Sequence, residues 1–198
     1  MEDFNDDSYC GIYCGACDIM NSYQTGKKQP LALFWNEKTV KSLQKGLGLK
    51  YDDSKPFTLE CHGCKSGQLF VNCRVCKKRE CAISRNLAHC IDCSDYPCDE
   101  IRSMQKNAFV LPHVKDNHTN MASIKSVGVE QWLKDQQNRW KCPKCNTGFS
   151  WYSEKCNSCG TNLRKYTWRF SSFRLLMLRF GIYMVSHTRR EKRSVEEM

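Results

Sequence analysis

Residues 73–81 read CRVCKKREC, and residues 90–98 read CIDCSDYPC. The two stretches repeat the spacing C-x2-C-x4-C, so each supplies one pair of cysteines two residues apart and one further cysteine. Cysteines spaced in this way serve as disulfide partners, metal ligands or nucleophiles. Because eight cysteines fall between Cys61 and Cys98 among few apolar residues, we expect this part of the chain to fold around bound metal.

The composition supports metal rather than disulfides. The chain has 198 residues, of which 15 are cysteine, a content that would indicate a disulfide framework in a secreted protein. The sequence begins with MEDFNDDSYC, which is acidic and has no basic or apolar signal region. We therefore predict a cytoplasmic protein, in which C-x2-C pairs bind metal.

The clearest metal-binding pattern lies in the C-terminal half, where CPKCNTGFSWYSEKCNSC contains two C-x2-C pairs. Each pair forms a tight turn, a knuckle, with both sulfurs on one side, and two knuckles complete the tetrahedron of a structural zinc ion. This spacing predicts a zinc ribbon with a hairpin between the knuckles, and rubredoxin-type iron is the alternative. The predicted ligands of this site are Cys142, Cys145, Cys156 and Cys159.

The N-terminal region contains 11 further cysteines, which we predict to be metal ligands as well. Zinc is favoured, and an iron-sulfur cluster is the alternative. The spacing C-x3-C-x2-C in CGIYCGAC is also that of radical-SAM enzymes, but the chain lacks the alternating βα pattern of their barrel. The spacing leaves open which sulfurs bind the same ion, and His62 or His89 is considered as a twelfth ligand. The predicted ligands are Cys10, Cys14, Cys17, Cys61, Cys64, Cys73, Cys76, Cys81, Cys90, Cys93 and Cys98.

These residues carry a resemblance to a known family. The segments SYCGIYCGACDIM and LECHGCKSGQLFVNCRVCKKRECAISRNLAHCIDCSDYPCDEI resemble the cysteine-rich prokaryotic proteins of domain-of-unknown-function family 3795, over about residues 8–105. Lys78 stands where members commonly have Ile. Longer relatives are similar to WLKDQQNRWKCPKC as well, which extends the likeness to about residue 160. The resemblance implies a cytoplasmic, zinc-binding protein without an established activity.

Helical periodicity places the remaining elements. Residues 30–47 are predicted to form the main apolar helix of the first domain, residues 99–106 a short helix, and residues 112–127 and 129–139 two connecting helices. We expect a small metal-stabilised α+β protein. Its predicted parts are a cysteine-rich metal-binding domain at 1–111, a helical linker at 112–139, a zinc ribbon at 140–163 and a basic apolar tail helix at 164–198.

The charge is concentrated in this tail, which has nine Lys or Arg and three Glu from Arg164 onward. The formal charge of the chain is +10, and three four-thiolate zinc sites would lower it to about +4. The run from Leu175 to Val185 is too short for a membrane span and contains Arg179. We expect residues 168–185 to pack against the protein or a second copy of it. Membrane-surface contact and, less favoured, nucleic-acid binding are the alternatives.

No motif in the sequence marks a catalytic residue. His113 and His118 are five residues apart on a predicted helix, so they do not form a metal-binding pair, and both are expected to face solvent. The function predicted from the sequence is therefore a non-enzymatic binding or adaptor module that holds two to four zinc ions and has a protein partner. An iron-sulfur or thiol-based redox protein is the alternative.

Overall fold

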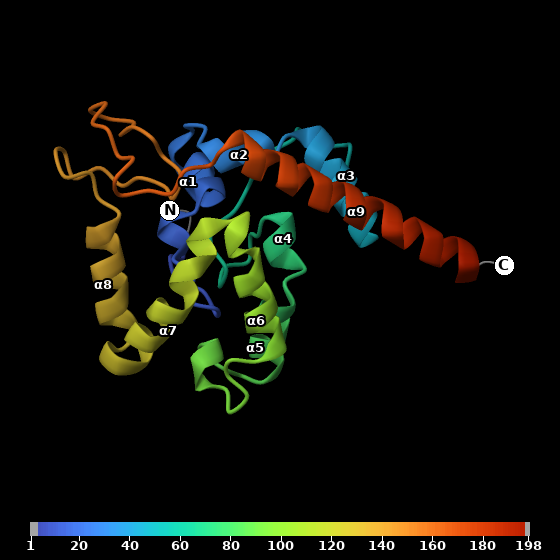
Figure 1. The fold of residues 1–198 in the computed structure, drawn as a ribbon, viewed down its shortest axis with the longest axis horizontal. Coiled ribbons are helices and arrows are strands. Elements are labelled where there is room, and N and C mark those ends of the chain that lie inside the picture. The colour runs from blue at the N-terminus through green and yellow to red at the C-terminus, as the bar shows by residue number, and fades with distance from the viewer. Residues whose placement is uncertain (1–3, 197–198) are drawn as a thin grey trace.

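The computed structural model describes residues 4–196, and in the last helix it describes side chains up to residue 186. Within this range the protein is built from helices joined by long loops (Figure 1). The 3-10 helices are η1 Cys14–Ala16, η2 Cys90–Asp92, η3 Asn107–Phe109 and η4 Pro112–Lys115. The α-helices are α1 Asp18–Thr25, α2 Pro30–Phe34, α3 Glu37–Leu47, α4 Val71–Arg74, α5 Lys77–Ser84, α6 Asp99–Lys106, α7 Asp116–Val127, α8 Val129–Arg139 and α9 Ser172–Glu196.

β-structure in the described residues is limited to two isolated antiparallel bridges, Lys141 with Gly148 and Lys155 with Asn162. The α+β class and the strand-bearing ribbon predicted from the sequence are therefore not supported. The reason lies in the residues between the two bridges. Instead of pairing into a hairpin, they turn toward the N-terminal region, and the backbone N–H of Trp151 donates to the carbonyl of Ala16 at 2.9 Å.

The predicted helix over residues 30–47 is two helices, α2 and α3. The break falls at Trp35 and Asn36, where Asn36 caps α3 by accepting a hydrogen bond from the backbone N–H of Thr39 at 3.0 Å. Breaking the helix lets Trp35 pack edge-to-face against Phe70, with ring centroids 5.1 Å apart. The predicted helices at residues 99–106 and 129–139 are confirmed, and residues 112–127 form η4 followed by α7.

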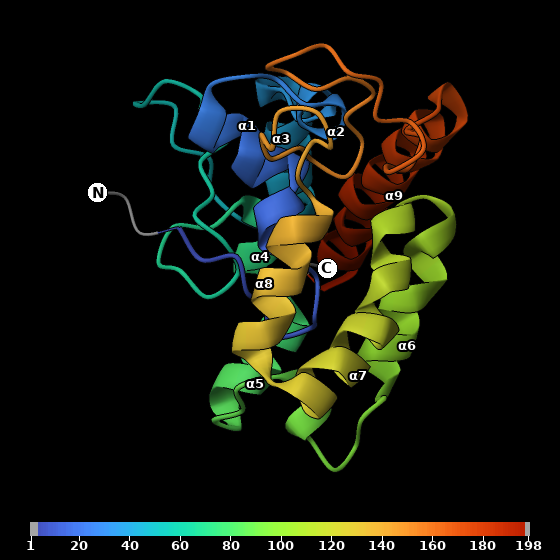
Figure 2. The ribbon, with the colours of Figure 1, turned by 90° about the vertical axis from the view of Figure 1, so that its left-hand side faces the viewer.

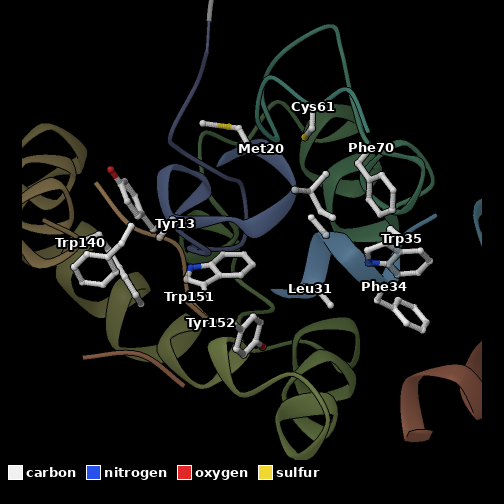
Figure 3. Packing of buried hydrophobic residues seen from close by; sticks show 14 of the residues in the cluster. Tyr13, Met20, Leu31, Phe34, Trp35, Cys61, Phe70, Trp140, Trp151 and Tyr152 are labelled. Carbon is white, nitrogen blue, oxygen red and sulfur yellow. The ribbon is translucent and has the colours of Figure 1, made fainter. Parts of the chain in front are cut away.

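One apolar cluster extends through the described chain. It includes residues of α1, α2 and the loop between the two knuckles, as the labelled side chains in Figure 3 show. Trp132 of α8 and Leu163 are completely buried in it. The cluster joins the N-terminal helices to the C-terminal cysteine-rich loops, so burial of apolar surface orders both cysteine-rich regions.

Buried polar contacts also hold the C-terminal loops on the N-terminal helices. The side chain of Asp18 is fully buried and accepts hydrogen bonds from the backbone N–H groups of Leu31, at 2.8 Å, and Tyr152, at 3.4 Å. Burial raises the pKa of this carboxyl to about 6, against these hydrogen bonds, which lower it. Gln29 accepts from the hydroxyls of Ser150 and Ser153 at 3.1 and 2.9 Å. These loops are therefore fixed to α1 and α2 by directed contacts.

The last helix, α9, lies along α3 and extends away from the rest of the protein (Figures 1 and 2). Its inner side carries Leu175, Leu178 and Ile182, which pack on the core, and its outer side leaves Phe173 and Phe180 exposed. The structure therefore buries one of the two apolar faces that the sequence places on this helix. No helix within residues 4–196 has the length and apolar character needed to cross a membrane.

Candidate metal centre

Four cysteines in the C-terminal half come together. The sulfurs of Cys142, Cys145, Cys156 and Cys159 all lie within 4.8 Å of one another. The distance from Cys142 Sγ to Cys159 Sγ is 3.6 Å, and that from Cys145 Sγ to Cys156 Sγ is 3.5 Å. Sulfurs bound tetrahedrally to zinc at 2.3 Å are about 3.8 Å apart, whereas a disulfide bond is about 2.0 Å long. The group can therefore hold a metal ion, and its four thiols are free.

Each of the two knuckles is closed by the same pair of backbone hydrogen bonds. In the first, Asn146 N–H donates to Cys142 C=O, and Cys142 N–H donates to Thr147 C=O, both at 2.9 Å. The residue after the second cysteine must adopt a left-handed conformation, and Asn146 has a φ of 58°. Asparagine and glycine tolerate this conformation better than other residues do.

The second knuckle repeats the first. Gly160 N–H donates to Cys156 C=O at 3.0 Å, and Cys156 N–H donates to Thr161 C=O at 2.9 Å. Gly160 takes the left-handed position with a φ of 71°. The repeated pattern C-x2-C followed by Asn or Gly and then Thr therefore builds two equivalent turns whose sulfurs face each other.

The threonine of each knuckle also prepares one thiol for metal binding. The hydroxyl of Thr147 lies 3.4 Å from Cys145 Sγ, and its hydrogen bonding lowers the pKa of Cys145 to about 6. The hydroxyl of Thr161 lies 3.1 Å from Cys159 Sγ and lowers the pKa of that thiol in the same way. Burial raises the pKa of Cys156 to about 11. Hydrogen bonding therefore favours the thiolate form of Cys145 and Cys159, and a cation bound here would stabilise the other two thiolates.

Within the described part of the chain, no other set of three or more His, Cys, Asp or Glu ligand atoms gathers as closely. The N-terminal cysteines are instead distributed over the helices, their ends and the loops between them. Cys17, Cys76 and Cys98 are the N-cap residues of α1, α5 and α6, and Cys14 and Cys90 begin η1 and η2. Cys10 precedes η1, Cys61 and Cys64 lie in the loop before α4, Cys73 is in α4, Cys81 is in α5, and Cys93 ends η2.

Most of these N-terminal cysteines are half-buried, Cys61 is buried and Cys81 is exposed. Burial raises the pKa of Cys17 and Cys64 to about 12. Burial, followed by the neighbouring Cys64 and Cys17, raises the pKa of Cys14 well above its ordinary value. A nucleophilic cysteine needs a lowered pKa, so these groups do not have the environment of a reactive thiol. Bringing several of them into the thiolate form together would require a cation among them.

His62 and His89, which the sequence offered as a twelfth metal ligand, are both buried beside cysteines. His89 Nε2 lies 2.9 Å from Asp7 Oδ2, and no local pattern predicts this contact because 82 residues separate the two.

The prediction that His113 faces solvent is wrong. Its ring stacks on Trp151 with centroids 3.8 Å apart, and its Nδ1 lies 2.6 Å from the hydroxyl of Tyr152. His113 lies in the short 3-10 helix η4, where the sequence predicted the start of a longer helix. Its contacts, Trp151 and Tyr152, are distant in sequence and could not be predicted from local periodicity. His118 is exposed, as predicted.

The fold and site thus define a mainly helical, cysteine-rich protein with a four-thiolate group able to hold a metal ion. Residues 7–103 match the model of the family described as "Protein of unknown function (DUF3795)", which supports the membership of this N-terminal region in that family. The match ends before the two knuckles, so the family likeness of residues 142–159 remains a prediction. Neither the curated proteins nor the solved structures gave a match.

Proposed function

We propose that this protein is a zinc-binding, non-enzymatic adaptor of the cytoplasm, in which bound ions fix the shape of surfaces that contact a partner. The observation that carries this proposal is the closed set of four sulfurs at Cys142, Cys145, Cys156 and Cys159. Structural zinc sites use four protein ligands, whereas catalytic sites keep one position open for water or substrate. Four free thiols at this separation also suit a reducing compartment.

Metal analysis of the full chain tests the proposal. Protein purified without oxygen should contain zinc, and native mass spectrometry should show that the double variant Cys145→Ser/Cys159→Ser binds one ion fewer. Lys144→Ala is the matched control, because this exposed residue lies in the same knuckle without offering a thiol, and it should keep the full metal content. Equal metal content in the cysteine variant and the control would refute the zinc site.

The alternative is a redox protein with iron at the cysteines. It is supported by the cysteine content of the N-terminal region, where Cys61 is buried and most of the others are half-buried, because cluster-binding cysteines are also shielded from water. A brown protein that contains iron and acid-labile sulfide would support this alternative over the zinc adaptor. Colourless protein containing zinc would exclude it.

The partner surface of the proposed adaptor is the outer side of α9. Phe173, Leu176, Phe180 and Tyr183 are all more than half exposed there. Their spacing of three, four and three residues is that of a coiled-coil seam, so the surface fits a helix, and we propose that the helix comes from a second copy of this chain. Sedimentation equilibrium should show a dimer that Leu176→Gln/Phe180→Gln disrupts. A wild-type monomer that floats with anionic vesicles would instead favour the membrane-surface alternative.

A further inference from the structure

The region around the C-terminal knuckles carries most of the net positive charge of the chain. Residues 139–174 contain eight Lys or Arg and one acidic residue, Glu154, so they hold +7 of the formal net charge of +10. Four thiolates and one zinc ion would lower this local charge to about +5. A surface of this sign attracts polyanions. The exposed basic residues, which we call the basic surface, are Arg139, Lys141, Lys144, Lys155, Arg164, Lys165 and Arg169.

Most of these cations are not neutralised by a carboxylate. Arg164 pairs with Glu154 at 2.7 Å, and Arg139 pairs with Asp116 at 2.6 Å. The other five form no ion pair with the side chains that the structure describes. The hydrogen bond from Arg164 also lowers the pKa of Glu154, so the one carboxylate of this region is ionised and already has a cationic partner. An approaching anion would therefore meet uncompensated positive charge.

Two of the basic side chains line a small cleft beside the second knuckle. The volume of the cleft is about 260 Å³. Most small-molecule sites have volumes of about 300–1,000 Å³, so this cleft is small for a complete cofactor, and its size suits one unit of a longer polymer. The residues that line it are Glu154, Arg164, Thr167, Trp168 and Arg169.

The fold fixes Trp168 in this cleft. Its backbone N–H donates to the carbonyl of Trp151 at 3.0 Å, and the hydroxyl of the neighbouring Thr167 donates to the carbonyl of Ser153 at 3.0 Å. The indole packs against Trp140, with ring centroids 5.6 Å apart, and stays half-buried. Because these contacts position the ring before a ligand arrives, stacking on it would cost little ordering entropy.

Aromatic rings and cations alternate around the cleft. The guanidinium carbon of Arg139 lies 5.7 Å from the centroid of the Trp168 ring, and Arg169 follows Trp168 in the chain and in the lining of the cleft. Tyr166 is a second exposed ring, with Lys165 Nζ 4.9 Å from its centroid. This combination suits a single strand of nucleic acid, because rings stack on bases while cations contact the phosphates.

We propose that the basic surface binds single-stranded nucleic acid, with one base stacked on Trp168 and the adjoining phosphates held by Lys165 and Arg169. This surface is separate from the outer side of α9, so a strand and a second copy of the chain can be bound together. The proposal rests on the proposed function in one respect, because a zinc ion at Cys142 and its three partners would fix the loops that carry the cations.

Fluorescence anisotropy with the zinc-loaded full chain tests the proposal. The probes are labelled strands of about 12 uridines and of about 12 thymidines, a duplex of the same length and inorganic polyphosphate as a competitor. At least one strand should bind, and the duplex should bind about tenfold or more weakly, because its bases cannot stack on Trp168. Failure of both strands to bind at low salt, or equal binding of the duplex or polyphosphate, would overturn the proposal. Binding of anionic vesicles without binding of a strand would overturn it as well.

The salt dependence of binding tests the phosphate contacts. Lys165→Ala/Arg169→Ala removes two of them, so the slope of log affinity against log salt concentration should become shallower by about 1.4. Lys38→Ala/Lys125→Ala is the matched control, because both are exposed lysines outside residues 139–174, and its slope should be unchanged. An equal change of slope in the two double variants would show a response to net charge alone and would contradict the proposal.

Replacing Trp168 tests the stacking. Trp168→Leu should weaken binding of the strand by about 5- to 150-fold without changing the salt slope, and Trp168→Phe, which keeps a ring, should lose less. Circular dichroism and zinc content show whether each variant is folded. If the leucine variant does not fold, the phenylalanine variant and the salt slopes decide. A folded leucine variant that binds as tightly as the wild type would refute stacking on this ring.

Metal content separates this proposal from the proposed function. If the chain contains zinc but binds neither strand, the nucleic-acid surface is refuted and the proposed function stands. If the chain binds no zinc, the proposed function fails whatever the result with the strands.

Discussion

The side-chain amide of Asn120 donates a hydrogen bond to the backbone carbonyl of Gly11 at 2.7 Å. Its Oδ1 accepts from Gln136 Nε2 at 3.2 Å, and Gln136 Oε1 in turn accepts from the indole N–H of Trp140 at 3.2 Å. Gly11 directly follows Cys10, a predicted metal ligand, and Trp140 lies two residues before Cys142. A continuous chain of buried hydrogen bonds therefore connects the two cysteine-rich regions through α7 and α8.

Replacing Asn120 by alanine should destabilise the protein. The change leaves the carbonyl of Gly11 and the amide of Gln136 without a buried partner, at a cost of about 1–3 kcal/mol for each unsatisfied group. Urea unfolding of the metal-loaded protein measures the loss. Gln131→Ala on α8 is the control, because Gln131 is exposed and bonds only to Asp135 at the surface, so its loss should be below about 0.5 kcal/mol. Similar losses of stability in both variants would show that the buried chain of hydrogen bonds does not stabilise the fold.

The contact between α3 and α9 predicts opposite effects for the same substitution in the two helices. A Cβ at Gly46 of α3 would lie 2.9 Å from the backbone Cα of Ser186 in α9, so Gly46→Ala should push the helices apart and destabilise the protein. Gly181 of α9 has open space around its Cβ position, and Gly181→Ala should stabilise the helix by up to about 1 kcal/mol.

Thermal unfolding of the two single variants checks this sign difference. The midpoint should fall for Gly46→Ala and rise for Gly181→Ala relative to the wild type. A rise for both would mean that the two backbones do not approach as closely as the structure shows, because helix propensity alone favours alanine at both positions.

Gly63 is the position where a side chain should be least tolerated. Its φ of 106° lies in the region that glycine favours, and an added Cβ would collide with the backbone carbonyl of Asn5. Gly63→Ala should therefore weaken both the fold and metal binding at the adjacent Cys64. Gly67→Ala is the control in the same loop, since nothing lies within 4 Å of its Cβ position. Unfolding and zinc content should change in the first variant only, and an unchanged Gly63→Ala protein would count against the placement of this loop.

Local sequence signals predicted the parts of the structure that depend on neighbouring residues. The knuckles at Cys142 and Cys156 follow from C-x2-C spacing and a tolerant next residue, and α8 follows from the periodicity of residues 129–139. The break between α2 and α3 was missed because burial of Trp35 against Phe70 outweighs the helical pattern. Contacts between distant segments, such as His89 with Asp7, have no local signature, so finding them required the structure.

The buried His113 makes the free energy of unfolding depend on pH, and its contribution can be separated from that of other titrating groups. Burial lowers its pKa to about 3, whereas an unfolded histidine titrates near about 6.5. Below that unfolded value, the unfolded state binds a proton that the folded state excludes. The stabilisation is therefore complete above about pH 6.5 and is lost as the pH falls toward about 3.

The variant His113→Gln separates this effect from the protonation of metal ligands, which is common to both proteins. The free energy of unfolding of the wild type, minus that of the variant, should decrease by about 2 kcal/mol between about pH 7.5 and pH 5. Urea unfolding at each pH measures both proteins. A difference that stays constant over this range would mean that His113 titrates equally in the folded and unfolded chains, and hence that its ring is in contact with water rather than enclosed by Trp151 and Tyr152.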